Sequence, residues 1–559
     1  MIKEHYPVVV VGAGPAGLTL ANLLGTLGVE TLLVERNSET VCEPRAVSID
    51  DESLRTMQSV GLIGEIQGAL VAGYGSHYFA ADGHCFAKVE PTGQPYGYPR
   101  RNAFRQPILE RQLRHGLGRF PIVTSRFSCE MMTITQGPSA VHVGLVDSDG
   151  TGHRVSCDYL IGCDGASSTV RKALGITLEG TTFSERWLII DLENCDNETM
   201  HTKVFCDPRR PCILLPGPSL TRRYEFKIHD RERDEDVLHP TMIERLLGTH
   251  GALPRSILRR KAVYTFHARI APRWQEGRIF LAGDSAHLTP PFAGQGMNSG
   301  IRDVQNLAWK LAAVLRGRAG IRLLETYEIE RRGHAWQMIQ LALRMGRIMA
   351  PRSRFAAWVH ESIFGALQLY PPARDYVAQM KYKPKPRVKR GFLIADRRPL
   401  RRTLVGRMFP QATLKCTDGA LVLLDDLLGN NFALLAYEEE VADIEALFGL
   451  PLWDRLACRR LLIFGRSAAR NQPPVATAVD ESGALAASFS SYRRHVLLLR
   501  PDRYVAAAIP LSKNASAIGT IERLLAETWK DTDGSDVAGR RLDRADHLGS
   551  GRAIAAISR

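Results

Sequence analysis

One stretch of the chain places a carboxylate, a proline loop and a glycine-rich turn at a spacing suited to ligand chemistry. In Arg278–Leu315 a short apolar run ends in a Gly-Asp pair whose acid is Asp284. Open α/β folds bind ligands at the carboxyl ends of their strands, so Asp284 is a candidate for binding sugar hydroxyls. The apolar residues of Val304–Val314 have helical spacing, and the N–H groups that start such a helix favour an electron-rich group. A flavin offers both partners, whereas the alternative is an ordinary strand, loop and helix with a capping aspartate.

A second set of residues, near the N-terminus, has the spacing of a dinucleotide-binding unit. A β-branched run (Pro7–Val11) leads into Gly-x-Gly-x-x-Gly, a helix and a second strand that ends at Glu35. Such glycines let a pyrophosphate approach the helix N-terminus, and the acid accepts hydrogen bonds from the adenosine ribose. A carboxylate there repels a 2′-phosphate, which disfavours NADP at this site. The predicted contacts are Gly12, Gly14, Ala16, Gly17, Glu35 and Arg36.

Three further segments are candidates for the same ligand. Arg45 follows the nucleotide unit, and Gln106 stands at the start of a later helix. A strand-to-helix turn carries the pair Asp164-Gly165. Taken alone, this turn is a capped helix start with Asp164 or Ser167 as the cap. Arg45 likewise has the alternative of being a surface charge.

Length and composition favour a globular protein of several domains. The chain has 559 residues, 45% hydrophobic and 24% charged, with a net charge of +14 that would attract acidic ligands. No apolar run is long enough for a membrane span, and the N-terminus lacks a secretory layout. Ten scattered cysteines without a Cys-x-x-Cys pair or zinc spacing predict a reducing cytoplasm and no metal site. The basic segment Lys381–Arg402 lacks aromatic stacking residues, so a solvated linker is expected there and no nucleic-acid binding.

Three motifs occur together in a definite order: GAGPAG, CDGASSTVR and LAGDSAHLTPPFAGQGMNSGIRD. This set resembles the class A FAD-dependent aromatic hydroxylases, a family of flavoprotein monooxygenases, over residues 5–345. The segments PRAVSIDDESLRTMQSVGL, PRRNAF, CDPRRP and GQGMNSGIRDVQNLAWKLA are similar to 3-(3-hydroxyphenyl)propionate hydroxylases. The TPPFAG loop is closer to polyketide and other phenol hydroxylases, which bears on the substrate and not on the chemistry.

The resemblance implies a reaction cycle and a set of cofactor contacts. FAD would be bound tightly and non-covalently, NADH or NADPH would visit transiently because the sequence has one complete nucleotide fingerprint, and O₂ would react with the reduced flavin. The flavin C4a-hydroperoxide would hydroxylate a phenol of the 3-(3-hydroxyphenyl)propionate type to an ortho- or para-dihydroxylated arene. Asp164 would also bridge FAD and the nicotinamide nucleotide. The FAD contacts carried over are Arg45, Gln106, Asp164, Gly165, Gly283, Asp284, Pro291, Gly294, Gly296, Met297 and Asn298.

The same resemblance places Arg45 and Pro291 at the isoalloxazine as catalytic candidates. His287 and Tyr224 are the candidates for a general base, and a structural role is the alternative for both. Short strands at Trp187–Asp191, Val204–Cys206, Cys212–Leu215 and Arg223–Ile228 predict a separate sheet, which in this family forms the substrate wall. Strand alternation puts Arg222, Tyr224 and Phe226 on one face and Arg223 on the other. Either arginine could bind a substrate carboxylate or lie on the surface, and periodicity alone does not choose.

The predicted fold class is α/β: a Rossmann-type FAD-binding domain, an inserted mostly β substrate domain as in p-hydroxybenzoate hydroxylase, and a C-terminal thioredoxin-like domain. The last lacks Cys-x-x-Cys, so packing or homodimerisation is expected and not redox chemistry. The predicted boundaries are 1–180 with 262–345 for FAD, 181–261 for the substrate sheet, 346–402 for a helical segment and basic linker, 403–530 for the C-terminal domain, and 531–559 for a disordered tail.

Two rival functions remain open on the sequence alone. The first is a hydroxylase of a larger polycyclic or polyketide phenol on the same scaffold. The second is a flavin-binding sensor or basic nucleic-acid-binding protein that uses Lys381–Arg402. Salt-dependent DNA binding would favour the second, together with no substrate-stimulated NADH oxidation.

Overall fold

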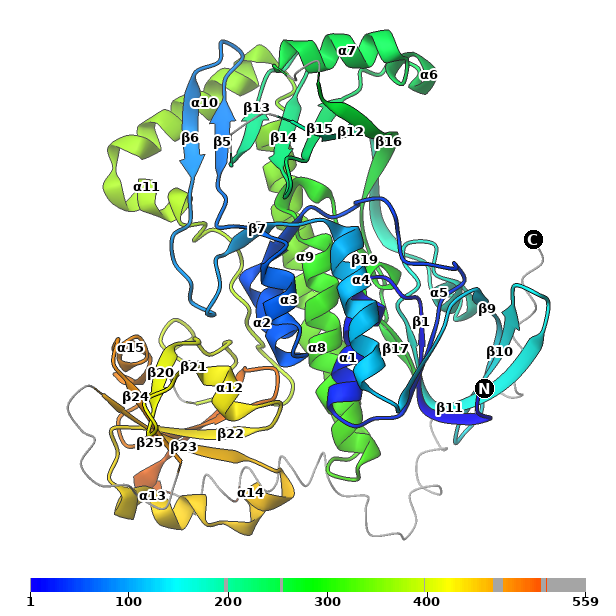
Figure 1. Ribbon diagram of the computed structural model, residues 1–559. Coiled ribbons are helices and arrows are strands. Elements are labelled where there is room, and N and C mark those ends of the chain that lie inside the picture. The colour runs from blue at the N-terminus through cyan, green and yellow to red at the C-terminus, as the bar shows by residue number, and fades with distance from the viewer. Residues whose placement is uncertain are drawn as a thin grey trace.

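The computed structural model describes residues 2–195, 200–251, 255–396, 398–465, 476–513 and 519. Figure 1 shows two sheets joined by the long central helices α8 (Gly296–Leu315) and α9 (Arg322–Met349), with a separate C-terminal body beside them. The predicted tail 531–559 lies outside the described residues. No helix in the described part of the chain is long and apolar enough to span a membrane.

The first sheet contains the N-terminal dinucleotide unit. Its strands run in the order β17-β18-β11-β1-β2-β8, and β10 and β9 extend it from β11. Val8, Val9 and Val10 of β1 are fully buried, as expected for a parallel strand covered on both faces. Helix α1 (Pro15–Thr26) packs against α8. The strands are β1 (His5–Val11), β2 (Thr31–Val34), β8 (Val123–Arg126), β9 (Cys129–Gln136), β10 (Val141–Asp147), β11 (Gly152–Gly162), β17 (Gln275–Glu276) and β18 (Ile279–Leu281).

The second sheet forms the upper body in Figure 1 and runs in the order β19-β16-β12-β15-β14-β13-β5-β6. Its outer strands β5 and β6 come from residues 76–89, which precede the second motif and lie within the predicted FAD-binding segment 1–180. Strand β13 pairs with β5 in parallel, which joins the two parts of the chain. The strands are β5 (Ser76–Phe79), β6 (Cys85–Val89), β12 (Glu179–Glu193), β13 (Thr202–Phe205), β14 (Cys212–Pro216), β15 (Arg222–Lys227), β16 (Ile257–Ile270) and β19 (His287–Leu288).

The two faces of this second sheet are covered by different elements. One face packs on α7 (Pro240–Thr249) through Ile243 and Leu246. The other packs on Phe292 of the proline loop and on Met349 of α9. Strand alternation therefore decides which side chains point towards the predicted flavin region.

A small sheet and several helices connect these bodies. Strands β3 (Ser48–Asp50), β7 (Arg101–Ala103) and β4 (Val71–Ala72) pair in the order β3-β7-β4. Helix α2 (Asp51–Ser59) packs on β3. The remaining helices of these bodies are α3 (Ile63–Gln67), α4 (Gln106–Gly116), α5 (Thr169–Ala173), α6 (Asp234–Val237), α10 (Arg354–Leu369) and α11 (Pro371–Ala378).

The C-terminal body is a seven-stranded sheet in the order β21-β20-β24-β23-β22-β25-β26. Strands β22, β23 and β24 are parallel, whereas β25 and β26 add an antiparallel edge. Its strands are β20 (Thr413–Cys416), β21 (Leu421–Leu423), β22 (Ala433–Tyr437), β23 (Arg459–Gly465), β24 (Thr477–Asp480), β25 (His495–Leu499) and β26 (Val505–Pro510). Its helices are α12 (Leu424–Leu428), α13 (Val441–Phe448), α14 (Pro451–Arg455) and α15 (Ala486–Phe489).

Candidate active site

The N-terminal glycines form a cradle at the carboxyl ends of β1 and β11. Gly12 has φ +101°, and a Cβ there would come within 2.5 Å of the carbonyl oxygen of Cys163. At Gly14, by contrast, a Cβ would meet no described atom within 4 Å, so open space lies before α1. Helix α1 starts after Gly14 without a side-chain cap, which leaves its first N–H groups available to a phosphate. The cradle fits a pyrophosphate.

Glu35 lies beside this cradle, directly after β2. Its Oε2 accepts a hydrogen bond from the N–H of Ala13 at 2.8 Å, and Oε1 accepts one from the N–H of Asn37 at 3.0 Å. The carboxylate is therefore fixed next to the glycine turn, as ribose binding requires. Arg36 is exposed, and the Cβ of Ala16 lies against Gly283 of the third motif.

Asp164 caps the start of α5. Its Oδ2 accepts from the N–H groups of Thr169 at 2.6 Å and Val170 at 3.0 Å, and Oδ1 accepts from the hydroxyl of Ser168 at 2.5 Å. Burial raises the pKa of this carboxyl group above its usual value. The N-cap residue of α5 is Ser168, whose hydroxyl accepts from the N–H of Arg171 at 2.9 Å, and not Ser167; Asp164 accepts from the other first-turn N–H groups. Gly165 follows with φ +79°, and the bridging role of Asp164 stays a prediction.

Asp284 is the candidate ribityl ligand, and it lies in the 3-10 turn Gly283–Ser285 after β18. Its side chain is exposed, and within the described residues it makes no hydrogen bond or ion pair. Desolvation by the surrounding protein nevertheless raises the pKa of this carboxyl group, while His287 and Arg45 oppose the rise. An exposed carboxylate that has no protein donor among the described residues is available to the hydroxyls of a ligand.

His287 has a structural environment instead of a catalytic one. Its side chain is fully buried, and Nε2 lies 2.7 Å from Oδ2 of Asp303. The ring stacks on Trp274 at 5.2 Å. Asp303 in turn accepts from the N–H of Gly283 at 3.2 Å and from Nε of Arg331 at 3.0 Å. His287 therefore supports the turn that carries Asp284, and its buried ring does not fit the general-base role predicted for it.

The glycine-rich turn lies against β3. Gly294 has φ +61°, a left-handed conformation, and a Cβ there would come within 3.2 Å of the side chain of Ser48. Asn298 is fully buried and all its polar atoms are used: Oδ1 accepts from the N–H of Asp50 and the hydroxyl of Ser53, and Nδ2 donates to the carbonyl oxygens of Gly294 and Ser48. This side chain shapes the turn and is not free for the flavin.

Helix α8 begins immediately after this turn without a side-chain cap at Gln295. Its first N–H groups, at Gly296 and Met297, are therefore available to an electron-rich ring edge. Pro291 starts the neighbouring 3-10 turn, Pro291–Ala293. The uncapped helix, the unpaired acid and the open cradle are the features that a flavin dinucleotide needs.

The loop that carries Arg45 is fixed from both sides. Oε1 of Gln106 accepts from the N–H groups of Arg45 at 3.1 Å and Ala46 at 2.7 Å. Arg223 donates to the carbonyl oxygens of Arg45, at 2.8 Å, and Pro44. The side chain of Arg45 itself is exposed. Gln106 thus acts here on the backbone of the loop.

The guanidinium of Arg223 is bound to other protein groups and is not available to a substrate carboxylate. Its Nε donates to Oδ1 of Asp191 at 2.7 Å, and its other N–H groups hold the Arg45 loop. Arg222, Tyr224 and Phe226 occupy the opposite face of β15. There the rings of Tyr224 and Phe226 belong to the buried cluster under α7, so they cannot line a site against the proline loop. We therefore withdraw these four residues as substrate contacts and Tyr224 as a base.

Aromatic side chains that we did not predict form the face towards the proline loop. Trp187, Phe266 and Phe292 lie within one cluster: the ring centroids of Trp187 and Phe292 are 5.4 Å apart, and those of Phe266 and Phe292 are 5.6 Å apart. Phe292 follows Pro291 directly, so this wall adjoins the candidate flavin position. Alternation along β12 would have indicated Trp187 and Ile189, but not which face turns towards the loop.

Arg302 is a second residue that we did not predict, although it lies in the quoted GIRD segment. Its Nη2 donates to Oε1 of Gln295 at 2.8 Å and to the hydroxyl of Ser299 at 3.2 Å. Its Nη1 lies 2.8 Å from Oδ2 of Asp50. Helical spacing places 295, 299 and 302 on one face, which was the available signal. The buried guanidinium ties the glycine-rich turn to α2.

The basic segment is not uniformly solvated. Lys383 reaches Oδ2 of Asp50 at 2.9 Å and Oε1 of Glu52 at 3.1 Å, and its side chain is 16% exposed. These carboxylates raise the pKa of Lys383 against the effect of burial. The segment is therefore partly a structural connection between the bodies, which corrects the expectation of a solvated linker.

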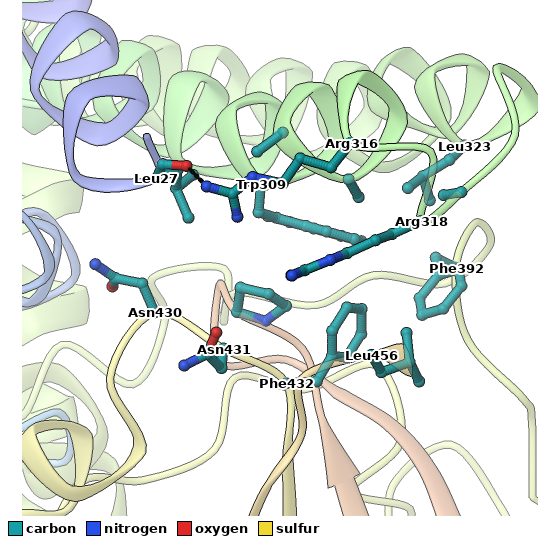
Figure 2. A pocket seen from close by; sticks show the side chains of 14 residues that line it. Leu27, Trp309, Arg316, Arg318, Leu323, Phe392, Asn430, Asn431, Phe432 and Leu456 are labelled. Carbon is teal, nitrogen blue, oxygen red and sulfur yellow. Dashed lines mark hydrogen bonds between the residues drawn. The ribbon is translucent and has the colours of Figure 1, made fainter. Parts of the chain in front are cut away.

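A small cavity of about 50 Å³ lies at the far end of α8 (Figure 2). It separates the C-terminal end of α8 from the C-terminal body and is lined by Trp309, Arg316, Arg318, Phe392 and Phe432, among others. Helix α8 has 20 residues, so its two ends are about 30 Å apart. This cavity is thus remote from the glycine-rich turn.

Comparisons with known proteins agree with this geometry. A family described as "FAD binding domain" matches residues 5–342, and one described as "HcaD C-terminal domain" matches 406–524. The 3-(3-hydroxy-phenyl)propionate/3-hydroxycinnamic acid hydroxylase of Mycolicibacterium gilvum (strain PYR-GCK) is 40% identical over 506 residues, covering 90% of this chain and 88% of the relative. The enzyme with the same description from Escherichia coli O81 (strain ED1a) is 36% identical and covers 94% of this chain and 96% of its own.

The crystal structure of aklavinone-11 hydroxylase with FAD and aklavinone is similar over 94% of this chain and 100% of that one, with a TM-score of 0.74 and 25% identity. The predicted fold class and FAD binding are confirmed by these matches. The chain therefore belongs to the FAD-dependent aromatic hydroxylases, a family of flavoprotein monooxygenases.

Proposed function

We propose that this enzyme hydroxylates a phenol with a short carboxylate side chain, of the 3-(3-hydroxyphenyl)propanoate type, with NADH or NADPH and O₂ as co-substrates. The observation that carries the proposal is the 40% identity, over nine-tenths of the chain, to a hydroxylase described for that substrate. The wall of Trp187, Phe266 and Phe292 supports it, because a phenol ring packs well on such an apolar surface.

FAD, when bound, supplies the hydride acceptor and the oxygen chemistry. The chain holds and shields that cofactor. In this proposal the start of α1 would hold the pyrophosphate, Asp284 would accept hydrogen bonds from the ribityl hydroxyls, and the start of α8 would donate to the pyrimidine edge. Arg45 and Pro291 would lie beside the ring, and the aromatic wall would exclude water from the reacting carbon.

Access of the nicotinamide nucleotide follows from the single dinucleotide unit in the sequence. NADH or NADPH then meets the flavin in a shared, partly open site, and an enzyme reduced without substrate would waste the nucleotide on peroxide. We therefore propose that phenol binding accelerates flavin reduction. A change of about 1.4 kcal/mol in the barrier corresponds to a tenfold faster reduction.

The test measures NADH and NADPH consumption with a panel of phenols and identifies the products by mass spectrometry. We expect 3-(3-hydroxyphenyl)propanoate to stimulate consumption and to gain one oxygen atom. Anaerobic mixing, with and without this phenol, tests the accelerated reduction. If the phenol stimulates nucleotide oxidation but only hydrogen peroxide forms, the compound is not the substrate.

A larger polycyclic phenol is the second candidate substrate. It is favoured by the TPPFAG loop and by the likeness to aklavinone-11 hydroxylase. The same panel decides between the two, because the preferred compound has the higher kcat/KM with tight coupling. Salt-dependent DNA binding without phenol-stimulated NADH oxidation would instead support the flavin-binding sensor.

For the C-terminal domain we propose a packing role. Trp309 of α8 packs on Phe432, with ring centroids 5.5 Å apart, and Glu330 of α9 forms buried ion pairs with Arg500 and Lys310. Removal of this domain would therefore expose apolar and charged surface of the FAD-binding domain. Homodimerisation stays a prediction, which light scattering on the purified protein tests.

A further inference from the structure

The side chain of Arg101 connects the flavin-side elements to the substrate sheet. Arg101 lies on β7 opposite Asp50 of β3, the strand whose Ser48 contacts Gly294. From there its Nη1 donates to the hydroxyl of Ser76 on β5. Arg101 therefore joins β7, which pairs with the strand beside the glycine-rich turn, to β5 of the substrate sheet.

The contacts of this guanidinium are with neutral groups. Nη2 lies 3.1 Å from the hydroxyl of Tyr74, whose ring centroid is 4.4 Å from the guanidinium carbon. Tyr78 and Tyr382 also face it, and burial raises the pKa of both phenols, so they stay uncharged at pH 7. Among the described residues no carboxylate lies within 4.0 Å of Arg101.

Other arginines of the same region have carboxylate partners. Arg223 pairs with Asp191, Arg302 with Asp50, and Arg105 with Glu193. A half-buried guanidinium surrounded by neutral hydroxyls gains from an anion because nearby water cannot fully solvate it. It also has five N–H donors, of which the described contacts use two.

Arg101 lies towards the β5 end of the sheet face that carries the aromatic wall, with β15, β14 and β13 between β12 and β5. Ser76 and Tyr78 alternate onto one face of β5, and Tyr78 belongs to the same buried cluster as Trp187 and Phe292. A phenol packed on this face between Trp187 and Tyr78, over Val204 and Ile213, would have a cation at its β5 end. Arginine binds a carboxylate through two parallel hydrogen bonds, which fixes orientation as well as affinity.

We propose that Arg101 binds the carboxylate of the aromatic substrate and thereby selects phenols with an acidic side chain. This subsite rests on the proposed function, since it takes the substrate to be a carboxylated phenol. Ser76 and Tyr74 act as positioning residues that orient the guanidinium. Arg101 takes the role that the sequence suggested for Arg222 or Arg223. Arg222 lies on the opposite face of the sheet, and Arg223 is paired with Asp191.

The test compares 3-(3-hydroxyphenyl)propanoate with 3-propylphenol, which has a methyl group where the acid has its carboxylate. In Arg101→Gln we expect the dissociation constant of the acid, read from the flavin absorption spectrum, to rise by about 10- to 100-fold. The kcat/KM for 3-propylphenol should change less than about threefold. Arg101→Lys keeps the charge without the fork and should fall between wild type and Gln.

Arg100→Gln is the matched control, because the neighbouring guanidinium donates to the carbonyl oxygen of Gln379 instead. It should leave both phenols unaffected. Equal losses for acid and neutral phenol in FAD-loaded Arg101 variants, or unchanged binding of the acid, would overturn the subsite. So would a wild type that prefers 3-propylphenol, even with hydroxylation intact. If wild type binds the acid through Arg101 but hydroxylates no phenol, the subsite stands and the proposed function fails.

Discussion

Replacing Arg302 by methionine is the most informative perturbation of the flavin-side structure. The side chain is 2% exposed and connects Asp50, at 2.8 Å, to Gln295 of the glycine-rich turn, also at 2.8 Å. Methionine retains much of the volume but none of the donors. Asp50 would keep Lys383, at 2.9 Å, as its remaining cation.

The magnitude follows from what each partner loses. Breaking a buried ion pair by removing one partner costs about 3–5 kcal/mol, because a carboxylate loses its compensation. We place Arg302→Met at about 3 kcal/mol, since Lys383 retains part of the compensation. The freed Gln295 should also loosen the start of α8, so that FAD binds at least about fivefold more weakly, equivalent to about 1 kcal/mol.

The destabilisation caused by Arg302→Met should change with pH in a definite direction. In the wild type, Lys383 and Arg302 outweigh burial and hold the pKa of Asp50 well below its usual value. Its contribution is therefore present at neutral pH and lost as pH falls through the folded pKa. Without Arg302 the pKa of Asp50 in the folded protein rises. Protonation of this carboxyl group then removes a poorly compensated buried charge from the variant. The destabilisation should be smaller at pH 4, near the usual pKa of an aspartate, than at pH 8.

The assay is urea unfolding at both pH values, with FAD release followed by flavin fluorescence. Arg105→Met is the matched control: its guanidinium pairs with Glu193 at 3.0 Å but is 33% exposed, so about 0–1 kcal/mol is expected. Adding Asp50→Asn should restore part of the stability of Arg302→Met. A loss below about 1 kcal/mol with unchanged FAD affinity would refute the reasoning.

Three further substitutions test other parts of the site. Asp284→Ala should weaken FAD binding by about 1–3 kcal/mol per lost hydrogen bond, measured by fluorescence titration; wild-type affinity would exclude the ribityl role. Arg45→Ala should slow flavin reduction or increase peroxide release without unfolding, as stopped-flow and peroxide assays would show; unchanged values would make it a surface charge. Burial raises the pKa of Glu225 to about 7. The destabilisation that comes from ionising this buried carboxyl group therefore grows between about pH 4.5 and about pH 7 and stays at its full value at higher pH. Glu225→Gln should therefore stabilise the protein at pH 8 more than at pH 5 in thermal unfolding, and an equal effect at both pH values would contradict this.

The local motifs were predictable from the sequence because each is a continuous strand, turn and helix. The strand Pro7–Val11 and the glycines after it appear in the structure as β1 and the start of α1. Hydrophobic periodicity likewise indicated α8, and the three motifs in order implied the family that the comparisons confirm. Such patterns depend on neighbouring residues, so they need no knowledge of the rest of the chain.

What periodicity left open was the face and partner of each side chain. Alternation separated Arg223 from Tyr224, but only the packing of α7 on one face of the sheet decided which pointed away from the proline loop. Asn298 has the identity of a ligand residue, yet its hydrogen bonds to residues about 250 positions away consume its polar atoms. The addition of β5 to the substrate sheet is equally non-local, since it pairs with β13.

The charged residues show the same difference between what the sequence predicts and what the fold decides. Composition established that the chain is basic, and the density of Lys381–Arg402 was visible in the sequence. Whether a given cation is solvated, paired or available depends on carboxylates brought near by folding. Lys383 finds Asp50 and Glu52, whereas Arg101 finds tyrosines and a serine. The sequence by itself thus determined the scaffold and the cofactor class, while tertiary structure decided which polar side chains remain free for chemistry, because that depends on partners distant along the chain.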